Sequence, residues 1–459
     1  MFEINFQKPI HVYFMGIGGI SMSGLAEILL SKGFPISGSD SQTSPLTDHL
    51  EKMGAKIYYG QRASNLDDTI DLIVYTAAIS TDNPEFIAMR EKAIPSLTRA
   101  QLLGQIMKNY DFPIGISGTH GKTTTTSMIS EILLQADTDP TLSIGGILKS
   151  IDGNIRIGES QLFVTEACEY TNSFLSFFPQ IALILNIEED HMDFFKNIEE
   201  IRNSFHQFAK LLPTDGTLII NGEIPDLSIF TVDLPCHKVS YGFDDSCDYY
   251  ASEISYDNEA KGSFVLHSPN FPPQIIHLGV PGKHNISNAM AAIALSDLLE
   301  IDRVIATNAL LTFSGTNRRF EVKGNIGGIT IIDDYAHHPT EIAATLHATR
   351  NYPHNDVWCV FQPHTYTRTK AFLGDFATAL SLADHIILAD IYAAREKNTL
   401  GITSQTLQAE IEKSGKKCYY FPCFDEIENF ILQNCINGDL LITMGAGDIV
   451  KVGESLLGI

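Results

Sequence analysis

The chain has 459 residues, of which 44% are hydrophobic and 19% are charged, a composition that excludes a disordered chain and a long coiled coil. This length favours about three domains. The formal net charge of −24 at pH 7 argues against a nucleic-acid-binding protein, which needs a basic surface. An acidic protein can still bind an anionic substrate where backbone N–H groups and a few Lys or Arg side chains create a positive site.

The cysteines and the N-terminal segment indicate the compartment. Seven cysteines without paired spacing are typical of a reducing compartment rather than of a disulfide framework. The apolar stretch at 11–20 is interrupted by glycines and is too short to span a membrane. We therefore expect a cytoplasmic protein without membrane insertion or nucleic-acid partners, and the sequence leaves open whether it is a monomer or a homodimer.

Strand, loop and helix patterns recur along the chain and predict three α/β segments with parallel sheets. The first segment comprises residues 1–108. Its predicted strands are His11–Met15, Pro35–Ser39 and Leu72–Tyr75, and a helical pattern follows the first of them.

A glycine run after the first strand resembles a dinucleotide-binding loop. Gly16, Gly18 and Gly19 open the helix, and Asp40 ends the next strand, where an acidic residue binds ribose hydroxyls in such sites. The third glycine of that fingerprint is replaced by Ser21, which disfavours NAD and a dehydrogenase. Two interpretations stay open: a ligand with a diphosphate at the helix N-terminus, or a tight turn that binds nothing.

The second segment, 109–316, contains the strongest motif. Its predicted elements are strands at Phe112–Ser117, Leu162–Thr165 and Ile181–Leu185, a helix at Thr123–Ala136, and peripheral β structure at 244–273.

GTHGKTTTT, residues 118–126, lies between a predicted strand and a predicted helix, which is where a phosphate loop works. Its glycines let backbone N–H groups approach phosphates, and Lys122 can reach the β and γ oxygens. The first glycine of the general pattern is absent, because that position is Ile116, so an ordinary glycine turn is the alternative. The loop residues predicted to bind a nucleotide are Gly118, Thr119, His120, Gly121, Lys122, Thr123 and Thr124.

A Mg²⁺ site is predicted beside this loop. Glu166 and His191 each follow a buried strand, and Thr123 can offer its hydroxyl. The predicted metal ligands are therefore Thr123, Glu166 and His191. His191 can equally be a hydrogen-bonded structural histidine.

The third segment, 317–459, has strands at Thr330–Ile332, Trp358–Phe361, His385–Leu388 and Leu440–Thr443. Each strand ends in a polar loop, and ligands of open α/β sheets gather at such ends. We expect an α/β protein of three domains: a Rossmann-like N-terminal domain, a central P-loop ATPase-type domain and a Rossmann-like C-terminal domain.

Several sequence blocks resemble the Mur ligases, bacterial enzymes that add amino acids to the peptidoglycan precursor. They cover most of the chain and are GIGGISMSGLAEILL, SGSD, GTHGKTTTT, EACEYTNSFLSFFP, LNIEEDHMDFF, GKHNISNAMAAIA, RRFEVKG, DDYAHHPTE, FQPHTYTRTKA, IYAAREKNTLG and GAGDI. The set is most similar to the members that join L-alanine to UDP-N-acetylmuramate. The resemblance implies an ADP-forming ligase that uses ATP and Mg²⁺ and makes an acyl phosphate on the lactyl carboxylate.

The resemblance also implies residue roles. The implied catalytic residues are Lys122, Glu166, His191, Arg319 and Asp334. His284, Asn285, Asn288 and Arg319 are expected to join the phosphate loop in binding ATP. The other interpretation of GKHNISN is a helix N-terminus with an Asn cap, which is compatible with the ligand role. The expected substrate contacts are Gly16, Gly18, Gly19, Ser21 and Asp40 for UDP, and His337, His364 and Arg368 around the amino acid.

The chain departs from the family pattern at two positions. Many members have a second arginine where this chain has Thr365, and other Mur ligases carry a carbamylated lysine in the region of His206. Two rivals stay open: a recycling ligase that joins a tripeptide to the same nucleotide sugar, and a non-enzymatic nucleotide switch. The EACEYTNSFL and AAREKNT blocks favour the alanine enzyme.

Overall fold

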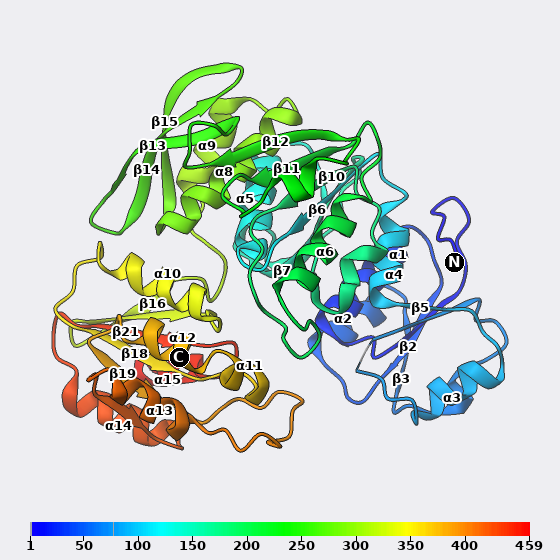
Figure 1. Ribbon diagram of the computed structural model, residues 1–459. Helices are drawn as coiled ribbons and strands as arrows, with labels where there is room; N and C mark the ends of the chain where they lie inside the picture. The colour runs from blue at the N-terminus through cyan, green and yellow to red at the C-terminus, as the bar shows by residue number, and fades with distance from the viewer. Residues whose placement is uncertain (1, 77) are drawn as a thin grey trace.

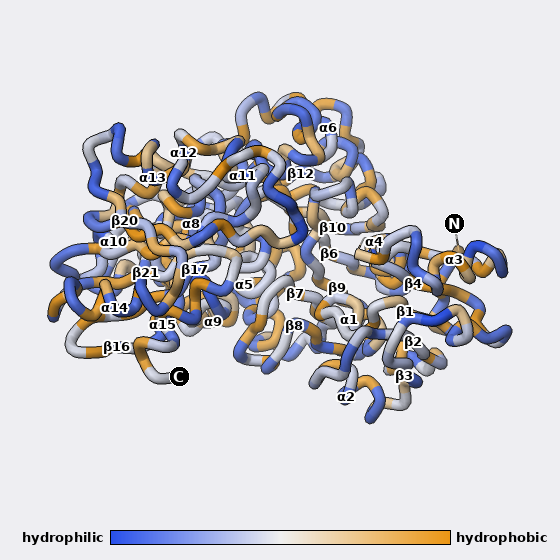
Figure 2. The backbone as a smooth tube through the Cα atoms, turned by 90° about the horizontal axis from the view of Figure 1, so that it is seen from below, coloured by the Kyte–Doolittle hydropathy of each residue, from blue (hydrophilic) through white to orange (hydrophobic). Residues whose placement is uncertain are grey.

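The computed structural model describes residues 2–76 and 78–459 and contains three β-sheets, one in each predicted segment (Figure 1). The central lobe lies between the N-terminal and the C-terminal lobe in both views (Figures 1 and 2). Helices cover the apolar strands of each sheet, and one cluster of buried apolar side chains continues from the N-terminal sheet, at Phe14, into the central domain, at Phe163 and Phe205.

The N-terminal sheet is fully parallel, with the order β3-β2-β1-β4-β5. The central strand β1 has four buried residues, so the glycine loop after it leaves the middle of the sheet. The elements are β1 (Val12–Met15), α1 (Ile20–Ser31), β2 (Ile36–Asp40), α2 (Pro45–Lys52), β3 (Lys56–Tyr59), β4 (Leu72–Tyr75), α3 (Pro84–Glu91), β5 (Ser96–Thr98) and α4 (Arg99–Met107).

The central sheet has ten strands in the order β15-β14-β13-β12-β11-β10-β6-β9-β7-β8. The antiparallel strands β13, β14 and β15 form one edge and confirm the peripheral β structure predicted at 244–273. The strands are β6 (Phe112–Ser117), β7 (Thr141–Leu148), β8 (Gly153–Arg156), β9 (Leu162–Glu166), β10 (Ile181–Ile184), β11 (Thr217–Asn221), β12 (His237–Gly242), β13 (Tyr249–Tyr256), β14 (Lys261–Ser268) and β15 (Phe271–Pro281). The α-helices are α5 (Lys122–Gln135), α6 (Ile198–Ala209), α7 (Ser228–Thr231), α8 (Lys283–Leu298) and α9 (Arg303–Thr312), and a 3-10 segment, η3, spans Tyr170–Ser176.

The C-terminal sheet has the order β16-β17-β21-β18-β19-β20, and only its edge strand β16 is antiparallel to its neighbour among the described strands. Its strands are β16 (Glu321–Ile326), β17 (Ile329–Asp334), β18 (Val357–Phe361), β19 (His385–Leu388), β20 (Cys418–Tyr420) and β21 (Leu440–Met444). Its helices are α10 (Pro339–Thr349), α11 (Tyr366–Ala371), α12 (Leu373–Leu380), α13 (Ser404–Lys413), α14 (Phe424–Asn434) and α15 (Val450–Leu457).

The predicted α/β architecture of three domains is confirmed. The domain boundaries at 108/109 and 316/317 stay a prediction. Within residues 2–76 and 78–459, no helix is both long enough and apolar enough to cross a bilayer.

Candidate active site

The phosphate loop connects β6 to α5 and depends on two glycines. Gly118 and Gly121 have φ angles of +149° and +82°, which side chains rarely adopt. A Cβ on Gly121 would lie 2.7 Å from Asn288 Oδ1, so there is also no room for a side chain. The chain therefore turns tightly into α5, and the loop backbone stays open to a phosphate group.

Lys122 is held by a carboxylate that the sequence interpretation did not single out. Its Nζ donates to Glu169 Oε2 at 3.0 Å and to the carbonyl oxygens of Gly118 and Thr119. Burial lowers the pKa of Lys122, but Glu169, Cys168 and Glu166 together outweigh burial, so the pKa lies above its ordinary value. Glu169 lies in the EACEY block, three residues after Glu166. A second acidic residue in the same block could have indicated from the sequence that Glu169 belongs to the site.

Glu166 ends β9 and faces β7. Its Oε1 accepts the Gly145 N–H at 2.6 Å, and a Cβ on Gly145 would lie 2.6–2.8 Å from the carboxylate atoms. Burial raises the pKa of the Glu166 carboxyl, while Gly145, Lys122 and Thr123 oppose this effect. Two of the three predicted metal ligands, Thr123 and Glu166, therefore interact directly.

His191 lies on the other side of Lys122. Its Nε2 is 3.6 Å from Glu169 Oε1, and its ring stacks on Tyr170 with centroids 4.5 Å apart. Burial lowers the pKa of His191, so the imidazole is neutral at pH 7 and can act as a ligand or a base. Glu169 thus joins His191 to Lys122, and the three predicted metal ligands lie around one lysine.

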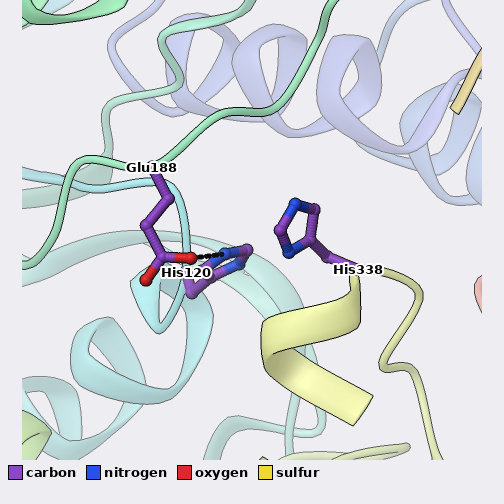
Figure 3. Close-up of side chains that lie close together, drawn as sticks. All are labelled: His120, Glu188 and His338. Carbon is purple, nitrogen blue, oxygen red and sulfur yellow. Dashed lines mark ion pairs between the residues drawn. The ribbon is translucent and has the colours of Figure 1, made fainter. Parts of the chain in front are cut away.

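A different trio, His120, Glu188 and His338, has ligand atoms close enough for a metal ion (Figure 3). However, His338 Nε2 is hydrogen-bonded to the carbonyl oxygen of Glu189 at 2.9 Å, and its Nδ1 accepts the Thr340 N–H at 3.3 Å. These bonds occupy both ring nitrogens of His338, and the trio is better described as a contact between the central and C-terminal domains.

His120 is the centre of that contact. Its Nε2 is 3.3 Å from Glu188 Oε2, and its Nδ1 is 3.2 Å from Glu341 Oε1 on α10. Burial lowers the pKa of His120, but the two carboxylates outweigh it and raise the pKa to about 9. The phosphate loop therefore carries an imidazolium that pairs with the third domain at pH 7.

A cavity between the central and C-terminal domains contains most of the predicted nucleotide-binding residues: His120, Gly121, Thr124, His284, Asn285, Asn288 and Arg319 line it, together with Asp334 and Glu341. The N-cap of α8 is Gly282, without a side-chain hydrogen bond, so the alternative of an Asn cap is wrong. Instead, Asn285 donates to the carbonyl oxygen of Pro281 at 2.7 Å, and Asn288 donates to Asn285 Oδ1 at 3.0 Å. Burial lowers the pKa of His284 to about 4.

The two arginines at 318 and 319 differ in their surroundings. Arg318 donates to Asp333 and to the carbonyl oxygens of Gly445 and Gly447, which fixes it within the C-terminal sheet. Arg319 faces the cavity, 3.9 Å from a Glu341 oxygen. Arg319, the arginine predicted to meet ATP, is thus not fixed within the C-terminal sheet as Arg318 is.

Asp334 lies at the wall of the same cavity but is bonded within its own domain. It accepts the N–H groups of Phe320 and Ala336 and the Thr345 hydroxyl at 2.8–3.0 Å. Burial raises its pKa to about 6. Through these bonds, the Asp334 carboxylate positions the start of the third domain. The catalytic role of Asp334 stays a prediction.

A second cavity of about 580 Å³ opens between His191 and the C-terminal domain. Arg368 and His364 line it, and Arg368 donates to Asp190 Oδ1 at 2.8 Å through its Nη2. Burial raises the pKa of Asp190, but Arg368, His191 and His338 together outweigh burial and hold this pKa well below its ordinary range. His337 lies beside this cavity, with its ring centroid 5.8 Å from that of His364.

The glycine loop of the first domain is closed by Asp40, which accepts the Gly18 N–H at 2.8 Å. A Cβ on Gly18 would lie 2.9 Å from Asp40 Oδ2, so the loop and the acid need this close approach. Gly16 has a left-handed φ of +78°, and Gly19 is the N-cap of α1. Ser21, on the first turn of α1, lines a third cavity that extends to Glu166.

Comparison with known proteins identifies the family. Residues 11–111 match the Mur ligase family, catalytic domain; residues 116–296 match the Mur ligase middle domain; and residues 318–447 match the Mur ligase, glutamate ligase domain. The chain belongs to the Mur ligase family.

Relatives of this Mur ligase are similar over the full chain. A UDP-N-acetylmuramate–L-alanine ligase of Agathobacter rectalis is 57% identical over 457 residues, covering 100% of both chains, and one of Lachnospira eligens is also 57% identical with the same coverage. Among solved structures, the UDP-N-acetylmuramate–alanine ligase of Thermotoga maritima is 29% identical, with a TM-score of 0.80 and 98% of both chains covered. A murein peptide ligase of Psychrobacter arcticus is 25% identical, with a TM-score of 0.69 and the same coverage.

The two departures of this Mur ligase from the family pattern have local structural roles. Thr365 has a φ of +66° and caps α11 by accepting the Arg368 N–H. His206, on α6, has its Nε2 2.9 Å from Asp233 Oδ1. Thr365 therefore positions Arg368, and His206 is engaged by an acid of its own domain.

Proposed function

We propose that this Mur ligase joins L-alanine to the lactyl carboxylate of UDP-N-acetylmuramate at the expense of ATP, in peptidoglycan biosynthesis in the cytoplasm. One observation carries the proposal: three cavities each reach a residue close to Lys122. The cavity between the central and C-terminal domains reaches Gly121, the second cavity reaches His191, and the third reaches Glu166. An enzyme that brings together a nucleotide sugar, ATP and an amino acid needs this convergence.

The chemistry requires an activated carboxylate. An oxygen of the lactyl carboxylate attacks the γ-phosphorus of ATP, the bond to the β,γ-bridging oxygen breaks, and ADP leaves with an acyl phosphate formed. Negative charge then spreads over the transferring oxygens, where Lys122 and Arg319 can neutralise it. Glu169 accepts from Lys122 Nζ at 3.0 Å and would have to release it to the phosphates.

The amino acid is proposed to bind in the cavity that Arg368 and His364 line. Arg368 would exchange Asp190 for the alanine carboxylate, as a planar guanidinium binds carboxylates in a bidentate way. Burial lowers the pKa of His364, which leaves a neutral imidazole able to take the amine proton. The amine attacks the acyl carbon, and the tetrahedral intermediate expels phosphate to give the amide.

The residues beside the phosphate loop suit Mg²⁺, which prefers oxygen ligands and keeps several waters. The Glu166 carboxylate and the Thr123 hydroxyl would hold the ion, and His191 is the third candidate. When bound, Mg²⁺ would neutralise phosphate charge. Gly145 contributes by fixing one Glu166 oxygen through its N–H.

The proposal is tested by incubating the full chain with ATP, Mg²⁺ and UDP-N-acetylmuramate, together with L-alanine, glycine, L-serine or the recycled tripeptide. Phosphate release and product mass are measured, and the nucleotide sugar is omitted as a control. We expect an L-alanine amide and substrate-dependent phosphate. A product with the tripeptide alone would favour the recycling ligase, and nucleotide binding without phosphate release would favour a switch.

A further inference from the structure

Arg99 is a half-buried cation whose charge is not balanced within the protein. It follows β5 directly and begins α4. Met15, Tyr75 and Thr98, at the ends of β1, β4 and β5, are register neighbours, so Arg99 and the glycine loop lie at the same edge of the sheet. Throughout residues 2–76 and 78–459, no carboxylate pairs with the Arg99 guanidinium and no group accepts a hydrogen bond from it.

Other half-buried or buried arginines of this chain have a carboxylate partner. Arg303 pairs with Asp297, Arg318 with Asp333 and Arg368 with Asp190. Each pair offsets the desolvation penalty of a charge that is removed from water. Arg99 is therefore an exception that needs an explanation.

The Arg99 side chain lines the cavity between the first and central domains. Ser21 and Leu25 of α1 form one side of this cavity, and Gly145, Asn154 and Glu166 form another. The two domains are in contact here, because α1 approaches Ile155 of β8 at Gly24, and Figure 2 shows α1 beside β8 and β9. The cavity thus extends from Ser21, just after the glycine loop, to Glu166, beside the phosphate loop.

Glu166 is the one acidic side chain among the described lining residues, and its charge is already engaged by Gly145, Lys122 and Thr123. Burial lowers the pKa of Arg99, but a guanidinium titrates so far above pH 7 that it stays charged. An unbalanced cation in a cavity that runs between a glycine loop and a phosphate loop attracts an anionic ligand.

We propose that Arg99 binds the diphosphate of the nucleotide sugar, across the cavity from the glycine loop; this inference rests on the proposed function. A guanidinium donates two parallel N–H groups to phosphate oxygens. The lactyl carboxylate is the other anionic group of this ligand, but the reaction needs it near Lys122 and Arg319. The diphosphate carries a permanent charge and would join α4 to α1 through the ligand.

The test is the affinity of the full chain, without ATP, for UDP, UDP-N-acetylglucosamine and UDP-N-acetylmuramate, measured by titration calorimetry. The variants are Arg99→Gln and Arg99→Lys. Arg90→Gln is the matched control, because Arg90 is an exposed arginine of the same domain whose guanidinium lies over Phe86. We expect Arg99→Gln to weaken all three ligands by the same factor, about 10- to 100-fold. Arg99→Lys retains part of the affinity, and Arg90→Gln retains all of it.

Stability separates binding from a structural role. Because Arg99 has no protein partner, we expect the ligand-free Arg99→Gln protein to unfold at the same temperature as the parent or at a higher one. A lower unfolding temperature, unchanged affinities, or a loss confined to UDP-N-acetylmuramate would each overturn the inference. If the parent protein binds none of the three ligands, the proposed function itself fails.

Discussion

Lys122 is the residue on which the proposed chemistry depends, and its charge is paired with Glu169. The pair is buried: the side chains of Lys122 and Glu169 are 15% and 2% exposed. The pair holds Lys122 at the phosphate loop. Removing either residue leaves the charge of the other buried and unpaired, which is destabilising. The phosphates of ATP would have to displace Glu169 as they bind.

Lys122→Ala should therefore lower both turnover and stability. Loss of a positioned charge at the transferring phosphoryl group lowers the turnover number by about 10²- to 10³-fold. The unpaired Glu169 lowers the free energy of unfolding by roughly 3–5 kcal/mol. Phosphate release and urea unfolding measure the two effects.

The double variant Lys122→Ala/Glu169→Gln is the control, because it removes both charges. It should recover most of the stability and none of the activity. A Lys122→Ala protein as stable as the parent would show that the pair contributes nothing to folding, and near-normal turnover would remove Lys122 from the mechanism.

At the scale of elements, β7 and β9 position the Glu166 carboxylate. The two strands are parallel neighbours, and Gly145 of β7 donates its N–H to Glu166. The absence of a side chain at Gly145 is what allows this contact. The position of a predicted metal ligand thus depends on a glycine of the adjacent strand.

Gly145→Ala should displace the Glu166 carboxylate, since the new Cβ would lie 2.6–2.8 Å from its atoms. Misplacement on that scale lowers turnover by about 100-fold and raises the Mg²⁺ concentration that the reaction needs. Gly374→Ala, in α12, is the matched control, because a Cβ there meets nothing within 4 Å. Equal turnover of the two variants would contradict the role of the β7–β9 contact.

The strands that sequence reasoning predicted are the apolar ones that lead into functional loops. Leu72–Tyr75 coincides with β4, and His385–Leu388 coincides with β19. The strands β3, β8 and β16 escaped prediction because they lie at sheet edges, where partial exposure leaves no continuous apolar run.

In the candidate site, too, sequence reasoning found the residues that belong to a local pattern and missed those that do not. Motifs predict Lys122 and Glu166, since the loop of Lys122 follows β6 and Glu166 stands at the end of β9. Glu169, Asp190 and Glu341 escaped because pairing is decided by tertiary contacts: 47 residues separate Lys122 from Glu169, 178 separate Asp190 from Arg368, and 221 separate His120 from Glu341. The EACEY block could have indicated Glu169 as a second acid, but spacing in one sequence does not indicate which residue each of these acids pairs with.

At the scale of the whole molecule, the C-terminal domain is docked on the central domain through charged contacts. His120 faces Glu341, Arg368 pairs with Asp190, and His338 is bonded to the carbonyl oxygen of Glu189. These contacts join the phosphate loop region to α10 and α11. The docking should therefore respond to pH.

His120 has a raised pKa of about 9, so its contribution to docking is complete below pH 6.5 and is lost as the pH rises through about 9. Glu341 has a lowered pKa, so its contribution is present above pH 4.5 and is lost in acid. We expect the radius of gyration from X-ray scattering to increase between pH 7 and pH 10.

Glu341→Gln should expand the protein already at pH 7 and reduce the response to pH. Glu410→Gln is the control, because Glu410 pairs only with Lys413 on the surface of α13 among the described residues. Identical scattering profiles of the parent at pH 7 and pH 10 would show that the imidazolium does not hold the domains together.

Activation of the carboxylate can be followed most directly through its oxygen atoms. UDP-N-acetylmuramate labelled with ¹⁸O in both lactyl carboxylate oxygens is incubated with the protein, ATP, Mg²⁺ and L-alanine, and the released phosphate is analysed by mass spectrometry. An acyl phosphate predicts one ¹⁸O atom in each phosphate released and one in the new amide. Phosphate free of ¹⁸O alongside a formed amide would contradict the proposed reaction.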